Sequence, residues 1–204
     1  MTLLLIRHGE TALNVARVLQ PAATPLSERG LAQAQALGRR LAGAGVRAIL
    51  SSDLPRALRT AELIAEHTGA PIETTPLLQE RNFGDWRGRP YAGLGPLPLE
   101  TSEAPPGGES MRAFEDRVAA AFAWVLTRRA ASGGTLAVVT HGLVLRVVLE
   151  RHARFEPGTG LPDHLGNTGL SIIEARAPHR VRLLNCTQHL EGGVQDDRGS
   201  LSGG

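Results

Sequence analysis

The feature that most constrains the fold is a regular alternation of short apolar runs with longer amphipathic segments. Residues 3–6, 46–50 and 135–139 are apolar over the length of a buried strand. Apolar residues recur at helical spacing in segments 27–43, 55–66, 109–129 and 143–151. Strands that alternate with helices predict an α/β fold, a three-layer α/β/α sandwich around a mostly parallel central sheet.

The remaining segments complete a predicted single domain over residues 1–190, a size that one hydrophobic core can stabilise. Residues 170–174 and 181–184 predict two strands that close the sheet. Residues 81–108 are rich in Gly and Pro, and so long a loop in a compact domain is usually a functional cover or lid. Residues 191–204 are rich in Gly, Asp and Ser and predict a C-terminal tail.

Composition excludes several chemistries. All 22 basic side chains are arginines, so the chain has no Schiff-base lysine and no phosphate-loop lysine. The single cysteine, Cys186, excludes an intrachain disulfide and a cysteine-rich zinc site. The net charge is only +2 and the arginines are scattered, so we expect no nucleic-acid partner. Arg7 interrupts the apolar N-terminus too early for a signal peptide or a membrane span, which predicts a cytoplasmic protein.

Two of the predicted strands end in the same dipeptide. His8-Gly9 follows the first apolar run, and His141-Gly142 follows the run at residues 135–139. Ligands of open α/β sheets bind beyond the carboxyl ends of the strands, so both histidines are expected at the functional edge. Glycine after each histidine lets the backbone turn sharply and approach a ligand. One such histidine is most often a satisfied core or loop residue, but the paired placement favours a site.

The neighbours of these histidines favour an anion over a metal ion. A metal needs a third ligand, and the chain has no HxH or HExxH spacing. Arg7 directly precedes His8, and a guanidinium matches phosphate through paired hydrogen bonds. Arg56 follows Pro55 in the first turn of a predicted helix, where free N–H groups also attract anions. With the amide of Asn14, these residues describe an anion pocket that contains a nucleophile.

Ordered motifs along the chain resemble the histidine phosphatase superfamily, also called phosphoglycerate mutase-like. They are LLLIRHGET at 3–11, TPLSERG at 24–30, SSDLPRALRTAE at 51–62, LLQERNFGDWRG at 77–88, PPGGES at 105–110 and VVTHG at 138–142. They occur in the family's order and span about residues 3–175. The resemblance implies a phosphoglycerate mutase-like fold and phosphoryl transfer from a small phosphorylated substrate, with no cofactor and no metal.

The resemblance also implies a role for individual residues. It makes His8 the nucleophile, which forms a phosphohistidine, and Glu80 the proton donor to the leaving alcohol. The residues that it implies for holding the phosphoryl group are Arg7, Asn14, Arg56, His141 and Gly142. Gln20 lies where phosphatases of the family often contact substrate.

Elementary chemistry sets conditions on these roles. An imidazole attacks phosphorus only when it is neutral, so the other ring nitrogen of His8 should donate to a backbone carbonyl. Glu80 can protonate an alkoxide only if burial or nearby anions raise its pKa. The same carboxylate then activates water to hydrolyse the phosphohistidine. Arg7, Arg56 and His141 are expected to supply the positive charge, so that no metal is needed.

The family contains both hydrolases and mutases, and this chain departs from the mutase pattern. Mutases typically have ERxYG where residues 80–84 are ERNFG, and they use a lysine that this chain lacks. We therefore predict a metal-independent phosphomonoesterase. The alternatives are a cofactor-dependent phosphoglycerate mutase and an inactive protein that binds a phosphorylated ligand. The substrate and the oligomeric state stay open: Arg87 or Arg89 either contacts a second anionic group or is a solvated loop residue.

Overall fold

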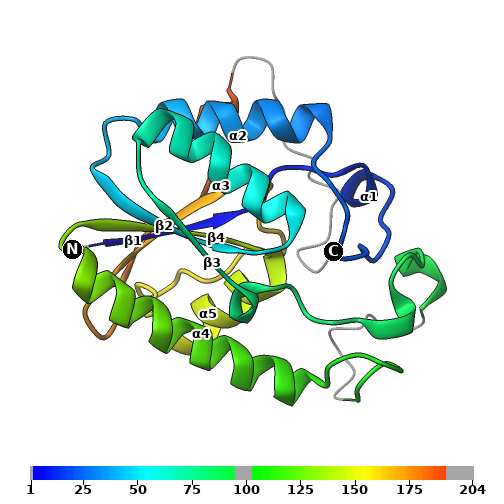
Figure 1. The fold of residues 1–204 in the computed structure, drawn as a ribbon. Helices are drawn as coiled ribbons and strands as arrows, with labels where there is room; N and C mark the ends of the chain where they lie inside the picture. The colour runs from blue at the N-terminus through cyan, green and yellow to red at the C-terminus, as the bar shows by residue number, and fades with distance from the viewer. Residues whose placement is uncertain (1, 95–102, 192–204) are drawn as a thin grey trace.

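A computed structural model describes residues 2–94 and 103–191 (Figure 1). At its centre lies a six-stranded sheet in the order β3-β2-β4-β1-β5-β6. The strands are β1 (Thr2–Arg7), β2 (Val46–Ser52), β3 (Ile72–Thr75), β4 (Thr135–Thr140), β5 (Leu170–Glu174) and β6 (Val181–Cys186). The first four are parallel, whereas β5 is antiparallel to β1, and β6 to β5. The predicted mostly parallel sheet is confirmed, and so is the strand pair that closes it.

Helices cover both faces of the sheet. The α-helices are α1 (Ala12–Val15), α2 (Glu28–Leu41), α3 (Pro55–Thr68), α4 (Met111–Ser132) and α5 (Gly142–His152). Short 3₁₀ turns are η1 (Pro76–Leu78), η2 (Gly84–Trp86), η3 (Tyr91–Gly93) and η4 (Gln188–Leu190). Helices α2 and α3 lie on one face, and α4 and α5 lie on the other (Figure 1). The predicted three-layer sandwich is confirmed.

Local sequence sets where the long helices begin. Ser27 caps α2 by accepting a hydrogen bond from the N–H of Gly30, and Ser110 caps α4 in the same way. Helix α3 begins at Pro55, whose fixed φ suits the first turn. The cap position of α3 is Leu54, which gives no side-chain bond.

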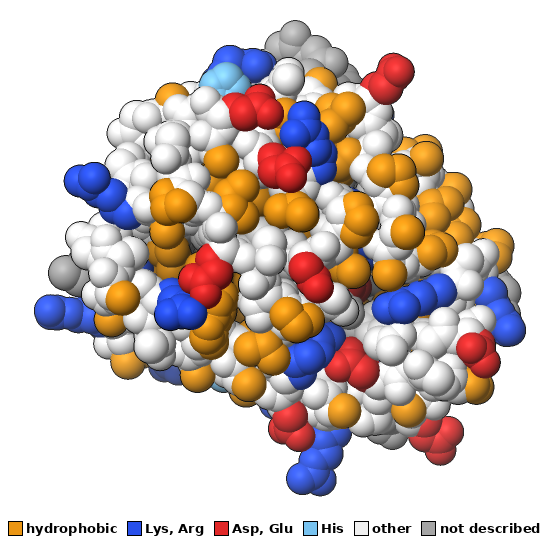
Figure 2. All heavy atoms as spheres, in the orientation of Figure 1, with side chains coloured by type: hydrophobic (Ala, Val, Ile, Leu, Met, Phe, Trp, Pro, Cys, Tyr) orange, Lys and Arg blue, Asp and Glu red, His pale blue; other side chains and the backbone are white. Residues whose placement is uncertain are grey.

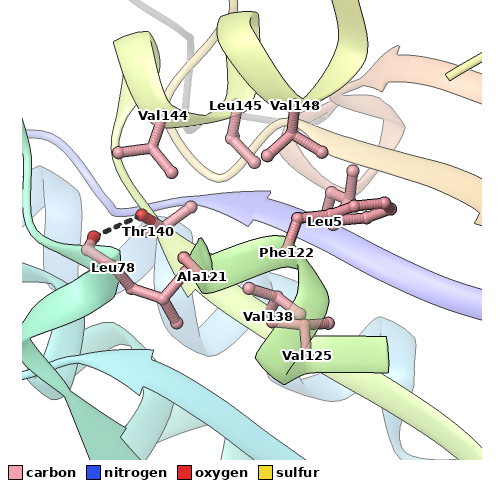
Figure 3. A pocket seen from close by; sticks show the side chains of 10 residues that line it. All are labelled: Leu5, Leu78, Ala121, Phe122, Val125, Val138, Thr140, Val144, Leu145 and Val148. Atoms are coloured by element: carbon pink, nitrogen blue, oxygen red, sulfur yellow. Dashed lines mark hydrogen bonds between the residues drawn. The ribbon is translucent and has the colours of Figure 1, made fainter. Parts of the chain in front are cut away.

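Each central strand contributes to two cores. Leu3 and Leu5 of β1 are buried with the apolar side chains of α4 and α5, whereas Leu4 and Ile6 are buried with those of α2 and α3. Because both faces are covered, the strand is an uninterrupted apolar run rather than an alternating one. Figure 3 shows the first core around a small apolar cavity, which side chains of β1, β4, α4 and α5 line.

The architecture brings the ends of three strands to one edge. Strands β1, β2 and β4 are parallel neighbours, so the residues that follow them, including His8 and His141, lie close together. Beside the cavity of Figure 3, the hydroxyl of Thr140 donates to the carbonyl of Leu78 at 2.7 Å. This bond ties the end of β4 to the segment that leads to Glu80.

Parts of two predicted segments lie outside the described residues. They are residues 95–102 of the predicted lid at 81–108 and residues 192–204 of the predicted tail at 191–204. The single domain over residues 1–190 stays a prediction. No helix in the described parts of the chain is long and apolar enough to cross a membrane. On the face that Figure 2 shows, basic side chains are dispersed and lie among acidic ones.

Candidate functional site

His8 follows β1 directly and its side chain is fully buried. Its Nδ1 lies 2.7 Å from the carbonyl oxygen of Gly9. A carbonyl only accepts, so Nδ1 carries the ring hydrogen and Nε2 keeps a lone pair. Among residues 2–94 and 103–191, no group forms a hydrogen bond with this Nε2. This is the arrangement that a nucleophilic imidazole requires.

The turn after His8 is packed so tightly that only glycine fits. A Cβ on Gly9 would lie 2.5 Å from the carbonyl oxygen of Gly30 in α2. The N–H of Gly9 donates to the hydroxyl of Thr60 at 3.0 Å, and that hydroxyl donates to the carbonyl of Arg56 at 2.7 Å. The turn that carries His8 is thereby fixed to both helices of that face.

His141 follows β4 directly and occupies the cap position of α5. Its Nε2 lies 2.9 Å from the hydroxyl of Ser52, the last residue of β2. This hydroxyl accepts the N–H of Leu54 at 3.2 Å, so its own hydrogen can be donated to Nε2. The ring hydrogen of neutral His141 then lies on Nδ1, which has no partner within the described chain. The rings of His8 and His141 are 5.2 Å apart between their centroids.

Two buried arginines belong to the same edge. Arg7 is fully buried at the end of β1, and Arg56 is 2% exposed in the first turn of α3. Nη1 of Arg7 donates to the carbonyl of Leu165 at 2.5 Å, and Nη1 of Arg56 donates to the carbonyl of Pro21 at 3.5 Å. Burial lowers the pKa of Arg56 to about 10, and the charges of Arg87 and Arg7 act in the same direction. Arg56 therefore stays protonated at neutral pH.

These surroundings keep both histidines neutral. Burial lowers the pKa of His8 well below its ordinary value, and the charges of Arg56 and Arg7 lower it further. Burial also lowers the pKa of His141 well below its ordinary value, with Arg56 as the next cause. Without a bound anion, the charge at this edge therefore comes from the arginines. The expectation that His141 supplies positive charge to a phosphoryl group stays a prediction.

Glu80 reaches the site from the segment after η1 and is 5% exposed. Its Oε1 accepts the N–H of Arg81 at 2.9 Å, and its Oε2 accepts the N–H of Leu143, in the first turn of α5, at 3.1 Å. Burial raises the pKa of Glu80, while the two N–H groups and the charges of Arg56 and Arg7 oppose the rise. The net shift is upward, which is the direction that a proton donor needs.

Arg117 of α4 holds the backbone that carries Glu80. Its Nη1 donates to the carbonyls of Leu77 at 2.9 Å and Gln79 at 2.8 Å, and its Nη2 donates to the carbonyl of Glu80 at 3.3 Å. The guanidinium also forms an ion pair with Glu109 at 2.7 Å. One side chain from a helix thus fixes the direction in which the Glu80 carboxyl enters the site.

Asn14 and Gln20 keep their amide nitrogens open because their oxygens are occupied. Oδ1 of Asn14 accepts the N–H of Thr11 at 3.1 Å in the capping box of α1, and Oε1 of Gln20 accepts the hydroxyl of Thr11 at 3.0 Å. Both side chains are buried, and neither amide nitrogen has a partner in the described residues. They are therefore donors that an anion can use.

A pocket opens beside this cluster. Its lining consists of Gln20, Ala22, Leu54, Arg56, Glu80, Arg81, Phe83 and Arg87. Arg87 is half-buried there, whereas Arg89 is exposed and is not part of the lining. The two arginines that the sequence left as alternatives therefore differ in position. Gly142, also predicted as a site residue, is the first residue of α5, directly after His141.

Sequence reasoning missed the residues that hold the site in place. They are Ser52, Thr60, Arg117 and Asn167. Asn167 donates to the carbonyl of His8 at 3.0 Å and to Oδ1 of Asn14 at 3.4 Å. Only Ser52 had a sequence signal, since it is a polar residue at the end of a predicted strand. Across residues 2–94 and 103–191, there is no group of three or more His, Cys, Asp or Glu that could hold a metal ion.

Comparisons with known proteins point to one family. The model of the histidine phosphatase superfamily (branch 1) matches residues 3–187. A protein named probable phosphoglycerate mutase GpmB, from Yersinia pestis (strain Pestoides F), is 34% identical over 193 residues, which cover 90% of this chain and 80% of that protein.

Two solved structures share the fold. YhfR of Bacillus stearothermophilus has a TM-score of 0.79 at 31% identity, over 93% of this chain and 99% of that one. A mycobacterial glucosyl-3-phosphoglycerate phosphatase, in complex with VO3, has a TM-score of 0.74 at 28% identity, over 89% of this chain and 96% of that one.

Proposed function

This chain belongs to the histidine phosphatase superfamily (branch 1), and from that premise we propose that it is a metal-independent phosphomonoesterase that acts through a phosphohistidine at His8. One observation carries the proposal: Nε2 of a neutral, buried His8 has no partner among the described residues and lies beside Arg7 and Arg56. The proposal takes residues 1–190 as one domain, residues 81–108 as its lid and a small phosphorylated metabolite as its substrate.

In the first step, the lone pair of His8 Nε2 attacks phosphorus while the bond from phosphorus to the ester oxygen breaks. The leaving oxygen takes the proton of Glu80, whose raised pKa keeps that proton available. The charge on the phosphoryl oxygens is stabilised by Arg7 and Arg56 and by the free N–H groups of Asn14 and His141. These donors are already in place, so little reorganisation accompanies the reaction.

In the second step, the Glu80 carboxylate accepts a proton from water as the water oxygen attacks phosphorus. The nitrogen–phosphorus bond breaks, its electron pair returns to Nε2 of His8, and inorganic phosphate leaves. Glu80 is protonated again, and the ester and one water have become an alcohol and phosphate. The bond from Nδ1 to the Gly9 carbonyl holds the imidazole in one orientation through both steps.

A phosphoglycerate mutase is the second candidate, because a 34% identical relative bears that name. A mutase must keep the phosphohistidine away from water and return the phosphoryl group to an acceptor. Phe83 lines the pocket beside Glu80 without the hydroxyl that mutases of the family typically have there. An inactive binding protein is disfavoured because binding alone does not require a nucleophile and a proton donor together.

The proposal is tested with purified protein in EDTA. We expect it to hydrolyse p-nitrophenyl phosphate, and we expect His8→Ala to show no turnover above background. A second assay supplies 3-phosphoglycerate with and without a bisphosphoglycerate primer and separates inorganic phosphate from 2-phosphoglycerate. Free phosphate without primer supports the phosphatase. Primer-dependent 2-phosphoglycerate identifies a mutase, and activity lost in EDTA contradicts the metal-free mechanism.

A further inference from the structure

One buried polar group beside the site has no part in the chemistry proposed above. The side chain of Tyr91, the only tyrosine of the chain, is 7% exposed. In the two described stretches of the chain, 2–94 and 103–191, its hydroxyl has no hydrogen-bond partner. A hydroxyl that is taken out of water without gaining a partner is costly, so a ligand that accepts its hydrogen would stabilise it.

The place of Tyr91 distinguishes it from other buried groups that have no partner. Within the described residues, several of these groups already belong to the site, among them His8, Asn14, Gln20 and His141. Arg129 also has unpartnered nitrogens, but it lies in the last turn of α4, at the opposite end of β4 from His141. The hydroxyl of Tyr91 is therefore a group of the site that still lacks a role.

The backbone holds Tyr91 against the segment that supplies two amides of the site. The N–H of Tyr91 donates to the carbonyl of Arg17 at 2.9 Å. Two residues earlier in the same loop, a carbonyl accepts the N–H of Leu19 at 2.9 Å. Arg17 and Leu19 stand between Asn14 and Gln20 in the sequence. The ring is buried in the core that also contains Leu19, so the hydroxyl is carried by a fixed side chain.

The hydroxyl is neutral and lies within the electrostatic field of the site. Burial raises the pKa of Tyr91, the charge of Arg7 opposes the rise, and the charge of Glu80 adds to it. Burial chiefly lowers the pKa of Arg56, and Tyr91 acts on it in the opposite direction. Because its pKa is raised, the hydroxyl keeps its hydrogen at neutral pH and can donate it.

Two parts of the reaction could use such a donor: the phosphoryl oxygens and the leaving oxygen. Glu80, which protonates the leaving oxygen, lines the open pocket, and Tyr91 is not part of that lining. Arg7, whose charge affects Tyr91 more than any other charge does, belongs to the buried cluster around His8 that receives the phosphoryl group. The position of Tyr91 therefore favours the phosphoryl oxygens.

We propose that the hydroxyl of Tyr91 donates a hydrogen bond to an oxygen of the transferring phosphoryl group, beside Arg7. This inference rests on the proposed phosphatase activity, and it adds a neutral donor to those of Asn14 and His141. Negative charge on the phosphoryl oxygens is stabilised in the transition state by donors that are already in place. The hydroxyl keeps its hydrogen through both steps, so the balance of protons is unchanged.

The first test removes the hydroxyl and keeps the ring. Tyr91→Phe is compared with the wild type and with Ser51→Ala, which removes a buried hydroxyl that donates to the Ser52 carbonyl at 2.8 Å. The measurements are kcat/KM for p-nitrophenyl phosphate and for glycerol 3-phosphate, and the dissociation constant of orthovanadate, a mimic of the transferring group.

We expect Tyr91→Phe to lower kcat/KM for both esters by about 10- to 100-fold, as for a lost hydrogen bond to a charged group. It should weaken the binding of orthovanadate by a similar factor, and Ser51→Ala should leave all three quantities unchanged. Thermal unfolding verifies that each variant is folded.

The second test observes the hydroxyl directly. Because Tyr91 is the only tyrosine, 3-fluorotyrosine places a single fluorine label next to the inferred contact. We expect one ¹⁹F resonance, and we expect saturation with orthovanadate to shift it in the otherwise unaltered protein. A tyrosine that only packs in the core would keep its resonance.

The proposal is overturned if Tyr91→Phe retains wild-type rates, if Ser51→Ala loses as much, or if the ¹⁹F resonance does not move. It is also overturned if glycerol 3-phosphate loses far more than p-nitrophenyl phosphate, because the hydroxyl would then serve the leaving oxygen. In each of these cases, hydrolysis by the wild type leaves the proposed phosphatase standing. If the wild type hydrolyses no ester, both proposals fail.

Discussion

Two His-Gly strand ends meet at one edge of the sheet, and they differ in which ring nitrogen the protein holds. His8 is held at Nδ1 by the carbonyl of Gly9, and His141 is held at Nε2 by the hydroxyl of Ser52. A carbonyl only accepts, whereas a hydroxyl both donates and accepts. His8 therefore presents a lone pair at Nε2, and His141 presents an N–H at Nδ1 when the Ser52 hydroxyl, which accepts the N–H of Leu54, donates to Nε2.

The comparison shows that burial and charge do not assign the two roles. Both side chains are fully buried, and the pKa of each is lowered well below its ordinary value, mainly by burial and next by Arg56. What differs is which ring nitrogen forms the hydrogen bond and whether its partner is a carbonyl or a hydroxyl. A nucleophile and a hydrogen-bond donor can thus be made from the same dipeptide at equivalent positions of one sheet.

The largest predicted effect separates the two histidines. His8→Ala should abolish the phosphoenzyme, whereas His141→Ala should slow its formation by about 10²- to 10³-fold, the usual loss for one transition-state donor. Each variant is mixed with an ester radiolabelled at phosphorus and quenched rapidly in alkali, and the label bound covalently to the protein is measured. Thermal unfolding verifies that both variants are folded. Label on His8→Ala, or equal loss in both variants, would contradict the assignment.

The next effect concerns the pH dependence of activity. Because both histidines are neutral, Glu80 is the group expected to titrate on the alkaline side of the activity profile. Its pKa is raised, so it loses its proton, and activity on alkyl phosphates falls, as the pH rises through that value. Glu80→Gln should lower alkyl ester hydrolysis by about 10²- to 10⁴-fold, the range of general acid catalysis. It should affect nitrophenyl phosphate far less, since that leaving group needs little protonation.

The ratio of wild-type to Glu80→Gln rates at each pH cancels the titration of the substrate itself. We expect this ratio to fall toward alkaline pH for alkyl esters. A ratio that is flat with pH, or equal losses on alkyl and aryl esters, would exclude Glu80 as the proton donor.

The smallest predicted effect tests what holds His141. Ser52→Ala removes the hydroxyl that fixes Nε2 and should lower kcat/KM by about 10-fold, which corresponds to one hydrogen bond. Ser51→Ala is the matched control, since Ser51 is equally buried and its hydroxyl donates to the Ser52 carbonyl at 2.8 Å instead. If steady-state rates fall equally in both variants, the Ser52 hydroxyl has no special role in orienting His141.

Sequence reasoning located the regular elements because local forces set them. The apolar run at residues 3–6 became β1, and Ser27 capped α2 where the periodicity begins. Sequence reasoning predicted less about the loop after Glu80, where the 3₁₀ turns η2 and η3 form within the predicted lid. Backbone bonds to Leu19 shape that loop, and no local pattern indicates them.

The candidate site was predictable to the extent that its residues stand at strand ends. The residues that orient the site act across long stretches of chain: Ser52 contacts His141 over 89 positions, and Arg117 contacts the Glu80 carbonyl over 37. Arg117 lies in a predicted helical segment, where an arginine is ordinarily expected on the solvent-exposed face. Nothing near it in the sequence distinguishes it from the other arginines.

The sequence by itself determined the order of strands and helices, the residue types at the sheet edge and the family, because side-chain periodicity, capping and turn chemistry act between near neighbours. Only the tertiary structure decided which nitrogen of each histidine stays free, which way the pKa of Glu80 moves and which loop arginine enters the pocket. Those properties depend on burial and on hydrogen bonds between distant segments, and these exist only once the sheet has brought its strand ends together.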